Sequence, residues 1–263
     1  MRVGDLRQSA KKRSARVLQQ RHSVPRPSRA PAGAGYSSKA VLPHHQVRKA
    51  LAQQDRTAGV VMTVDGKPVA LDPARDSLIN VNALGMPTPS ARFTSGREYQ
   101  VVRGHSAAPR ENDVLIVLDD SLLLLPSVQP LTGPFQGRRF GWTPTEPAVT
   151  DPKRNVVLAF CLALMTAECL AMTCADRTVI VEGPIARNLY HPNMLAAATG
   201  LAVIAAATQT GTAIGAALLF TGDGAVSLAQ NTAKVLACDT NLVRYAKDWR
   251  AAVQRHVNSA PIV

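Results

Sequence analysis

The sequence predicts an α/β fold with a parallel sheet, because residues 179–219 form two successive strand–loop–helix patterns. In the first pattern, the β-branched run 179–181 meets a glycine-containing loop and an alanine-rich helix. A second apolar run and a Thr-Gly-Thr loop then lead into another helix. Gly183 and Gly211 stand at the mouths of the two loops. Exposed backbone amides and helix N-termini can meet negative charge there, so we expect a nucleotide or phosphate site.

The positive charge of the chain is concentrated at its start. The 263 residues carry a net charge of +12. Residues 1–58 hold thirteen Lys and Arg against two Asp, whereas the remaining 205 residues hold seventeen Lys and Arg against sixteen acids. The segment 23–38 is rich in Pro, Gly, Ser and Ala, and such a composition cannot bury enough apolar surface to offset chain entropy. We predict a disordered basic tail over 1–58 and a nearly neutral folded domain over 59–263.

The first half of this domain predicts strands and loops. Segments 60–66 and 67–72 suggest a hairpin about Asp65-Gly66, which is a strong turn dipeptide. Residues 78–102 contain several Pro and Gly and predict a loop-rich region. Residues 113–128 predict one or two strands, and residues 133–144 predict an aromatic loop punctuated by glycine.

The second half predicts helices around the parallel strands. Asp151 and Pro152 supply an N-cap and a proline at the first helical position, so a helix should run to about Met172. It is apolar on nearly every face, which predicts burial. The other expected elements are a strand over 178–182, a helix ending at Gly200, a strand over 201–206, a helix from Thr212 to about Phe220, and a last helix containing 241–256 with Tyr245 and Trp249 on its inner side.

The cysteines and the apolar segments favour a cytoplasmic protein. Cys161, Cys169, Cys174 and Cys238 show neither a C-x-x-C pattern nor a metal-ligand spacing. We interpret them as small buried apolar residues in a reducing compartment, with three of them on one apolar helix. The most apolar stretch, 156–172, contains Glu168 and is short for a bilayer crossing, so it predicts a core helix. The N-terminus has no hydrophobic region of the kind found in secretory signals.

Five segments of the folded part carry a resemblance to a known family. They are NVNALGMPTPSARFTSGREY (80–99), LALMTAECL (162–170), VEGPIARN (181–188), TGTAIGAALL (210–219) and the closing RYAKDWRAAV (244–253). On these segments, residues 59–263 resemble the C-terminal half of the FGGY family of carbohydrate kinases, closest to its xylulokinase-like and fuculokinase-like members. Their order and spacing agree over about 200 residues, which is much more specific than a single glycine motif.

The resemblance implies an actin-like/ribonuclease H-like ATPase domain. In such kinases ATP, with Mg²⁺, lies largely against the C-terminal domain and the sugar mainly against the N-terminal one. The loop corresponding to 182–188 should pass close to the adenine and ribose, although Pro184 stands where many members have another glycine. The candidate nucleotide-binding residues are Glu182, Gly183, Pro184, Ala186 and Asn188. Each also has a local interpretation, such as a tight turn for Gly183 or a helix cap for Asn188.

Other residues of the matching segments are given structural roles. Gly211, Thr212 and Gly215 would let the next helix pack tightly and hold the loop in place. Asn80, Arg92, Arg97 and Glu98 lie in a region that the subgroup shares, and we expect structural use. His105, His191 and His256 have no matching base or metal partner in the sequence, so we treat them as structural or surface groups.

The groups that would hold the sugar and accept its proton have no counterpart in the sequence. In the family the general base is an aspartate upstream of the first hairpin of the C-terminal domain, and here the basic tail occupies that region. Thr57-Ala58-Gly59 matches the Thr/Gly phosphate turn of the family only weakly. The residues around Asp55 do not match the family's motif for the general base. We assign no catalytic residue and no metal ligand. The primary hypothesis is a truncated or split kinase domain that is inactive alone and that binds a partner chain or self-associates.

Two other hypotheses remain. The basic tail could bind nucleic acid or an acidic surface through counterion release, but it lacks interleaved aromatic residues and a recognisable fold. Alternatively, an Arg-rich and acid-poor start is typical of a transit peptide, which the length and the prolines of this segment do not favour.

Overall fold

The computed structural model describes residues 50–54, 59–64, 67–82, 85–206, 232–235 and 239–259. The chain divides into two units, 1–37 and 38–263, and all of these residues belong to the second. The expectations for most of the tail, for the loop and helix around Gly211, and for Cys238 lie outside the described residues.

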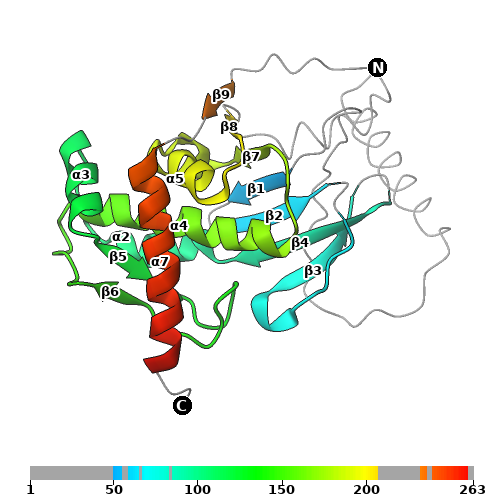
Figure 1. Ribbon diagram of the computed structural model, residues 1–263, viewed down its shortest axis with the longest axis horizontal. Coiled ribbons are helices and arrows are strands. Elements are labelled where there is room, and N and C mark those ends of the chain that lie inside the picture. The colour runs from blue at the N-terminus through cyan, green and yellow to red at the C-terminus, as the bar shows by residue number, and fades with distance from the viewer. Residues whose placement is uncertain are drawn as a thin grey trace, which may run out of the picture. The chain divides into compact units, whose positions relative to one another are not determined.

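A seven-stranded mixed sheet organises the domain (Figure 1). The strands run in the order β3-β4-β2-β1-β7-β8-β9, with β1, β7 and β8 parallel and the other pairs antiparallel. Their bounds are β1 Ala50–Gln54, β2 Gly59–Thr63, β3 Ser77–Val81, β4 Pro87–Phe93, β7 Val179–Glu182, β8 Val203–Ala206 and β9 Thr232–Val235. The predicted α/β class with parallel strands is therefore confirmed.

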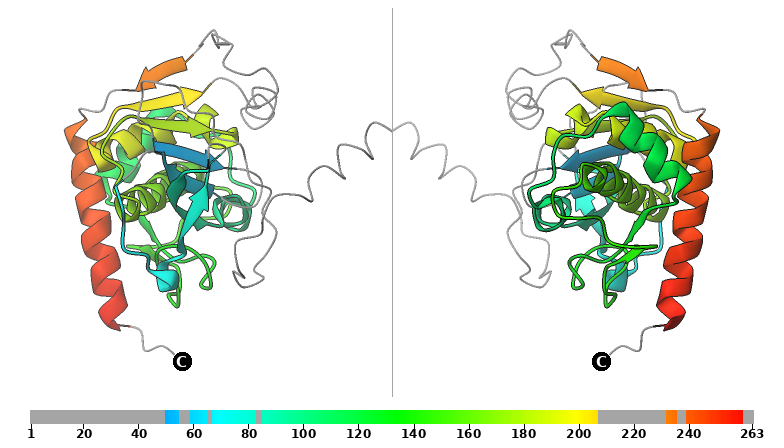
Figure 2. Two further views of the ribbon diagram at one scale, coloured as in Figure 1. Left: turned by 90° about the vertical axis from the view of Figure 1, so that its right-hand side faces the viewer. Right: turned by 90° about the vertical axis from the view of Figure 1, so that its left-hand side faces the viewer.

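Helices and a small second sheet complete the domain. The helix α4 crosses the sheet, and α5 packs against both α4 and α7 (Figures 1 and 2). The bounds are α2 Ser95–Arg103, α3 Glu111–Asp119, α4 Lys153–Met172, α5 Tyr190–Thr199 and α7 Thr240–Ser259, with short 3₁₀ turns η2 Pro73–Arg75 and η3 Pro184–Arg187 and a two-stranded sheet of β5 Leu123–Leu125 and β6 Gly141–Thr143.

Strand β1 lies inside the range that the sequence assigned to the tail. It pairs with β2 on one side and with β7 on the other, so it occupies the middle of the sheet. The sheet therefore extends at least as far as Ala50, nine residues before the expected start of the domain at residue 59.

The predicted hairpin about Asp65-Gly66 is wrong, because residues 67–72 contain no strand. Strand β2 pairs with β1 and β4 instead, so neither of its edges is open to a third strand. The ladder between β2 and β4 ends at Met62 and Ser90. Pro89 follows there, and it has no N–H with which to continue the ladder.

Two further local predictions are wrong. Residues 78–102 were expected to be loop-rich but form β4, α2 and most of β3. The first part of 113–128 belongs to α3 rather than to a strand, whereas β5 agrees with the strand expectation. The Asp113 carboxylate accepts the Arg110 backbone N–H at 2.6 Å and thereby caps α3. The run 114–118 is apolar throughout, so its pattern does not distinguish a strand from a helix. Burial of Val117 and Leu118 in the folded domain favours the helix.

The long apolar helix is confirmed as the core of the domain. The Asp151 side chain accepts the Lys153 N–H at 2.9 Å, as an N-cap does. Among the described residues α4 is the one helix long and apolar enough to cross a membrane, and 83% of that stretch is buried inside the domain. Cys161 and Cys169 are buried on it, as predicted, whereas Cys174 lies beyond its end and is exposed.

The last helix is confirmed with its two aromatic residues facing inward. Tyr245 donates its hydroxyl to the Leu122 carbonyl at 2.7 Å, and Trp249 donates Nε1–H to the Leu124 carbonyl at 2.8 Å. The Trp249 ring meets Phe135 edge to face, with the ring centroids 5.8 Å apart. These contacts fix α7 against β5 across more than a hundred residues of sequence.

We expect Gly133→Ala to lower the free energy of unfolding by about 2 to 4 kcal/mol. Gly133 has a φ of +85°, and an added Cβ would lie 2.8 Å from the Phe93 Cβ. The control is Gly137→Ala, because Gly137 has a φ of +77° and nothing within 4 Å. The control should lose only the backbone strain, about 1 kcal/mol. Equal losses in urea titrations would contradict the close contact with Phe93.

Candidate functional site

The carboxyl ends of the three parallel strands β1, β7 and β8 lie on one side of the sheet. This row of strand ends, called the carboxyl edge, forms the candidate site. The register places Gln53 of β1 opposite Glu182, and Val181 opposite Ala205 of β8. The carboxyl ends of β1, β7 and β8 therefore lie side by side. Ligands of open α/β sheets bind outside such carboxyl ends. Of the Thr57-Ala58-Gly59 segment, only Gly59 is described, as the first residue of β2.

Gly183 makes the turn from β7 into the loop. Its φ is +86° and its ψ is −167°, a conformation that is open essentially only to glycine. Glu182 ends β7 and is half-buried, and Pro184 starts η3 and is exposed. Ala186 is buried beside this turn. The sequence around Gly183 thus folds into a compact turn, in which Gly183 is half-buried and Ala186 is buried.

Asn188 joins this turn to the start of α5. Its Oδ1 accepts the backbone N–H groups of Tyr190 at 2.9 Å and of His191 at 3.3 Å. The local interpretation as a helix cap is therefore correct. Since the amide oxygen is used in this way, the Nδ2 group is the part of Asn188 that could donate to a ligand.

His191 is buried at the start of α5. Neither of its ring nitrogens has a hydrogen-bond partner among the described residues. Burial lowers the pKa of His191 from 6.5 to about 3, so the imidazole is neutral at physiological pH. A group with this pKa is a poor general base, in agreement with the structural role expected for it.

Of the four residues of the shared subgroup segment, Arg92 lies in the same cross-strand row as Gln53 and Glu182, but three strands away from β7. Asn80 and Arg92 lie on β3 and β4, which β2 and β1 separate from β7. Arg92 pairs with Asp76 at 2.8 Å, and the second carboxylate oxygen of Asp76 accepts the Gly133 N–H at 3.1 Å. Asp76 thus ties β4 to the loop after β5. No local sequence pattern predicts this role, because Asp76, Arg92 and Gly133 lie far apart in the chain.

Glu98 is a buried acid in the core. Its side chain accepts from the Thr94 hydroxyl at 3.5 Å. Burial raises the pKa of Glu98 to about 7, and the Thr94 contact opposes the shift. Arg97, the neighbouring residue of the segment, is exposed on the same helix.

The other two histidines lie outside the candidate site. His105 is exposed, and His256 is half-buried with its Nε2 3.0 Å from the Arg139 carbonyl. The described part of the chain contains no cluster of three or more His, Cys, Asp or Glu residues that could hold a metal ion.

A mixed sheet with a glycine turn after one of its parallel strands is typical of α/β domains, which bind ligands outside the carboxyl ends of their strands. The comparison with protein families gives the particular family. Residues 57–230 match the model of the carbohydrate kinase FGGY C-terminal domain. The chain belongs to the FGGY family of carbohydrate kinases, and its fold is the actin-like/ribonuclease H-like one that the sequence resemblance implied.

Solved structures agree with this assignment. A carbohydrate kinase from Novosphingobium aromaticivorans is 25% identical with a TM-score of 0.68, over 82% of this chain and 49% of that one. A xylulose kinase from Bifidobacterium adolescentis is 16% identical with a TM-score of 0.55, over 77% and 44%. A Plasmodium falciparum glycerol kinase with ADP is 12% identical with a TM-score of 0.58, over 79% and 47%. The chain spans about half the length of these kinases. The comparison with curated proteins gives no match.

Proposed function

We propose that this chain is the ATP-binding domain of a carbohydrate kinase, with the nucleotide held at the turn 182–188. The observation that carries the proposal is Gly183, whose positive φ makes the turn between the parallel strand β7 and η3. At the start of α5 the N–H groups of Tyr190 and His191 are bonded to Asn188, and Pro192 has no N–H. The proposal therefore rests on the backbone of the Gly183 turn and not on free N–H groups of α5.

The residues at this turn fit a nucleotide. Gly183 has no side chain and is half-buried, so a ligand can approach its backbone. The Nδ2 group of Asn188 can donate to the base or the ribose. MgATP, when bound, supplies the phosphoryl group and the cation that balances its charge. We propose that Mg²⁺ is held mainly through phosphate oxygens and water, since the described residues offer no carboxylate cluster.

We further propose that the chain does not phosphorylate a sugar by itself. Proton removal from a sugar hydroxyl needs a positioned base. His191, in the first turn of α5, is buried, so it is poorly placed to act as this base. Asp55 lies outside the described residues. The groups that hold a pentulose or deoxysugar would then come from a partner chain. We also propose that the protein acts in the cytoplasm.

Calorimetric titration with ATP and Mg²⁺ tests the nucleotide site, with Asn188→Asp as the informative variant. Aspartate keeps the oxygen that caps α5 but loses the Nδ2 donor, so stability should stay unchanged while affinity falls about tenfold. Asn188→Ala should lose both the affinity and about 1 kcal/mol of stability. Unchanged affinity in Asn188→Asp would contradict the proposed contact.

Gly183→Ala provides a second test of the same turn. It forces an alanine to a φ of +86°, so ATP affinity should fall together with about 1 to 2 kcal/mol of stability. Gly200→Ala is the matched control, because Gly200 caps the other end of α5 at a φ of +69° with nothing within 4 Å. The control should lose similar stability and keep the affinity.

A coupled assay with Mg-ATP and a panel of pentuloses and deoxysugars tests the proposed inactivity. The purified chain should bind ATP and release no ADP above the blank. Turnover without a second subunit would refute the inactivity and leave the nucleotide site standing.

Nucleic-acid binding through the basic segment is the alternative function, and it rests on charge alone. Heparin retention that depends on residues 1–49, with preference for a particular DNA or RNA, would favour it over the kinase proposal.

A further inference from the structure

Strand β3 is the last strand at one edge of the described sheet (Figure 1). It reads Ser-Leu-Ile-Asn-Val and has no charged residue and no proline. Ile79 is 40% exposed and Val81 is 61% exposed. Natural sheet edges are usually protected by charges, prolines, bulges or covering segments. This edge has neither of the first two, and it carries apolar side chains.

The pairing with β4 decides which backbone groups of β3 point outward. Arg92 donates its N–H to the Asp76 carbonyl, and Asn82 donates its N–H to the Met86 carbonyl. Residues of an antiparallel strand alternate between bonding inward and outward, so the even-numbered residues bond to β4. The N–H and C=O groups of Ser77, Ile79 and Val81 therefore point away from the sheet.

One of these three outward positions is already occupied. The Ser77 N–H donates to the Asp72 carbonyl at 3.4 Å, and the Ser77 hydroxyl donates to the same carbonyl at 3.0 Å. Ile79 and Val81 have no such outward partner among the described residues. The open part of the edge is thus the pair Ile79 and Val81, with Asn80 midway between them.

We propose that this open edge pairs with the same edge of a second copy of the chain, with a two-fold axis beside Asn80. Antiparallel pairing about that axis places Ile79 opposite Val81 of the other copy and makes four backbone hydrogen bonds. Directly opposed side chains point to the same face of a sheet, so both Ile79 and both Val81 side chains meet there.

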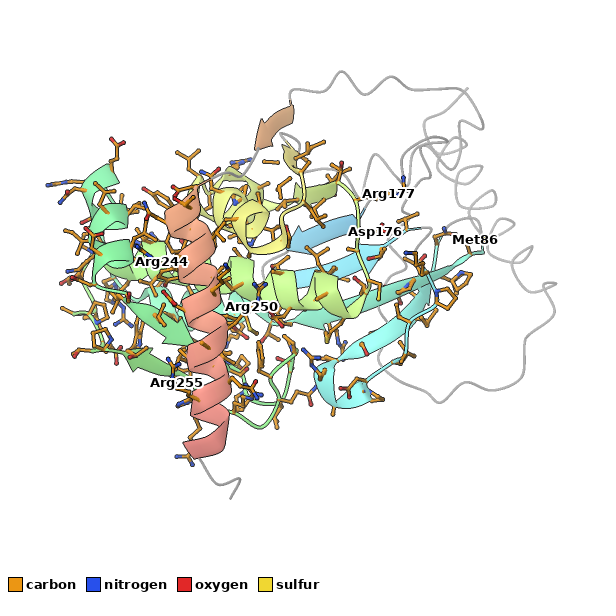
Figure 3. All side chains as sticks on the ribbon, in the orientation of Figure 1. Met86, Asp176, Arg177, Arg244, Arg250 and Arg255 are labelled. Atoms are coloured by element: carbon orange, nitrogen blue, oxygen red, sulfur yellow. The ribbon has the colours of Figure 1, made fainter. Side chains whose placement is uncertain are left out.

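Two observations favour a second copy over another occupant. Pairing centred on Asn80 is self-complementary and uses only the open positions Ile79 and Val81, whereas pairing centred on Ile79 would need the capped Ser77. The strand is also uncharged, so identical edges do not repel one another. Met86 is exposed in the connection between β3 and β4, just before β4 begins, and adds apolar surface beside the open edge of β3 (Figure 3).

The mass of the full chain in solution tests the pairing, measured by light scattering over a wide range of concentration. The mass should double as concentration rises. Val81→Lys should remain monomeric, because it places two charges at the pairing site. Val101→Lys is the control, because Val101 is 47% exposed on α2, and it should associate as the natural chain does.

Two further variants keep the test decisive if Val81→Lys fails to fold. Val81→Pro removes an outward N–H and no bond to β4, so it should abolish association and leave the circular dichroism spectrum unchanged. Asn80→Cys should form a disulfide-linked dimer under mild oxidation, because non-hydrogen-bonded residues face each other closely across antiparallel strands. The natural chain, which has the exposed Cys174, is the oxidation control.

A monomer at the highest soluble concentration would overturn the proposal. Association unaffected by Val81→Lys and Val81→Pro would also overturn it, because the interface would then lie elsewhere. Assemblies larger than a dimer would point to open pairing of β3 with a different edge and would equally overturn the two-fold arrangement.

Discussion

Trp249→Ala should lower the free energy of unfolding by about 3 to 5 kcal/mol, as expected for loss of a fully buried tryptophan. The ring has no exposed surface, and its edge contact with Phe135 joins α7 to the loop after β5. The substitution leaves a cavity and an unpaired Leu124 carbonyl. Guanidinium unfolding followed by circular dichroism measures the loss.

The second tryptophan supplies the matched control. Trp142 is half-buried, its Nε1 has no hydrogen-bond partner among the described residues, and its ring faces the Arg154 guanidinium at 4.9 Å. Trp142→Ala should therefore cost less, about 1 to 2 kcal/mol. Trp249→Phe keeps a ring and loses the hydrogen bond, so it should fall between the two alanine variants. Equal costs at Trp142 and Trp249 would contradict the role given to α7.

The stability of the protein should fall as pH rises through the range in which Glu98 ionises. The pKa of Glu98 is raised by burial from 4.5 to about 7. Between these values the folded state binds more protons than the unfolded state, so stability decreases with pH. From about pH 5 to about pH 8 the loss should be about 2 to 3 kcal/mol.

Glu98→Gln isolates this contribution, because glutamine stays neutral at every pH. The difference between the natural chain and Glu98→Gln in urea unfolding should grow with pH in favour of the variant. Glu111→Gln, a change at an exposed acid of α3, should keep the pH dependence of the natural chain. A difference that does not change with pH would mean that Glu98 is not buried as described.

Features that depend on local sequence were predicted well. Asp151 and the apolar run behind it define α4, and the spacing of Tyr245 and Trp249 places both on one side of α7. The strand–glycine–helix order at 179–199 also agrees with the structure, down to the helix end at Gly200. In each case the signal lies within one or two turns of the residue concerned.

Features that depend on pairing between distant segments were not predicted. Strand β1 is partly polar and follows a basic segment, so only its place between β2 and β7 identifies it as a central strand. The run at Val114–Leu118 fits a strand or a helix equally well, and burial of Val117 and Leu118 decides for the helix. Asp65-Gly66 is a strong turn signal, yet β2 had no free edge for the expected partner.

The sequence by itself determined the α/β class, the FGGY family and the position of the Gly183 turn, because glycine and periodic apolar residues act locally. The tertiary structure alone decided that the Oδ1 of Asn188 caps α5, that Glu98 is held in the core, and that β3 is the last strand at one side of the described sheet. Hydrogen-bond partners, burial and strand neighbours are relations between distant residues, so they are fixed only when the chain has folded.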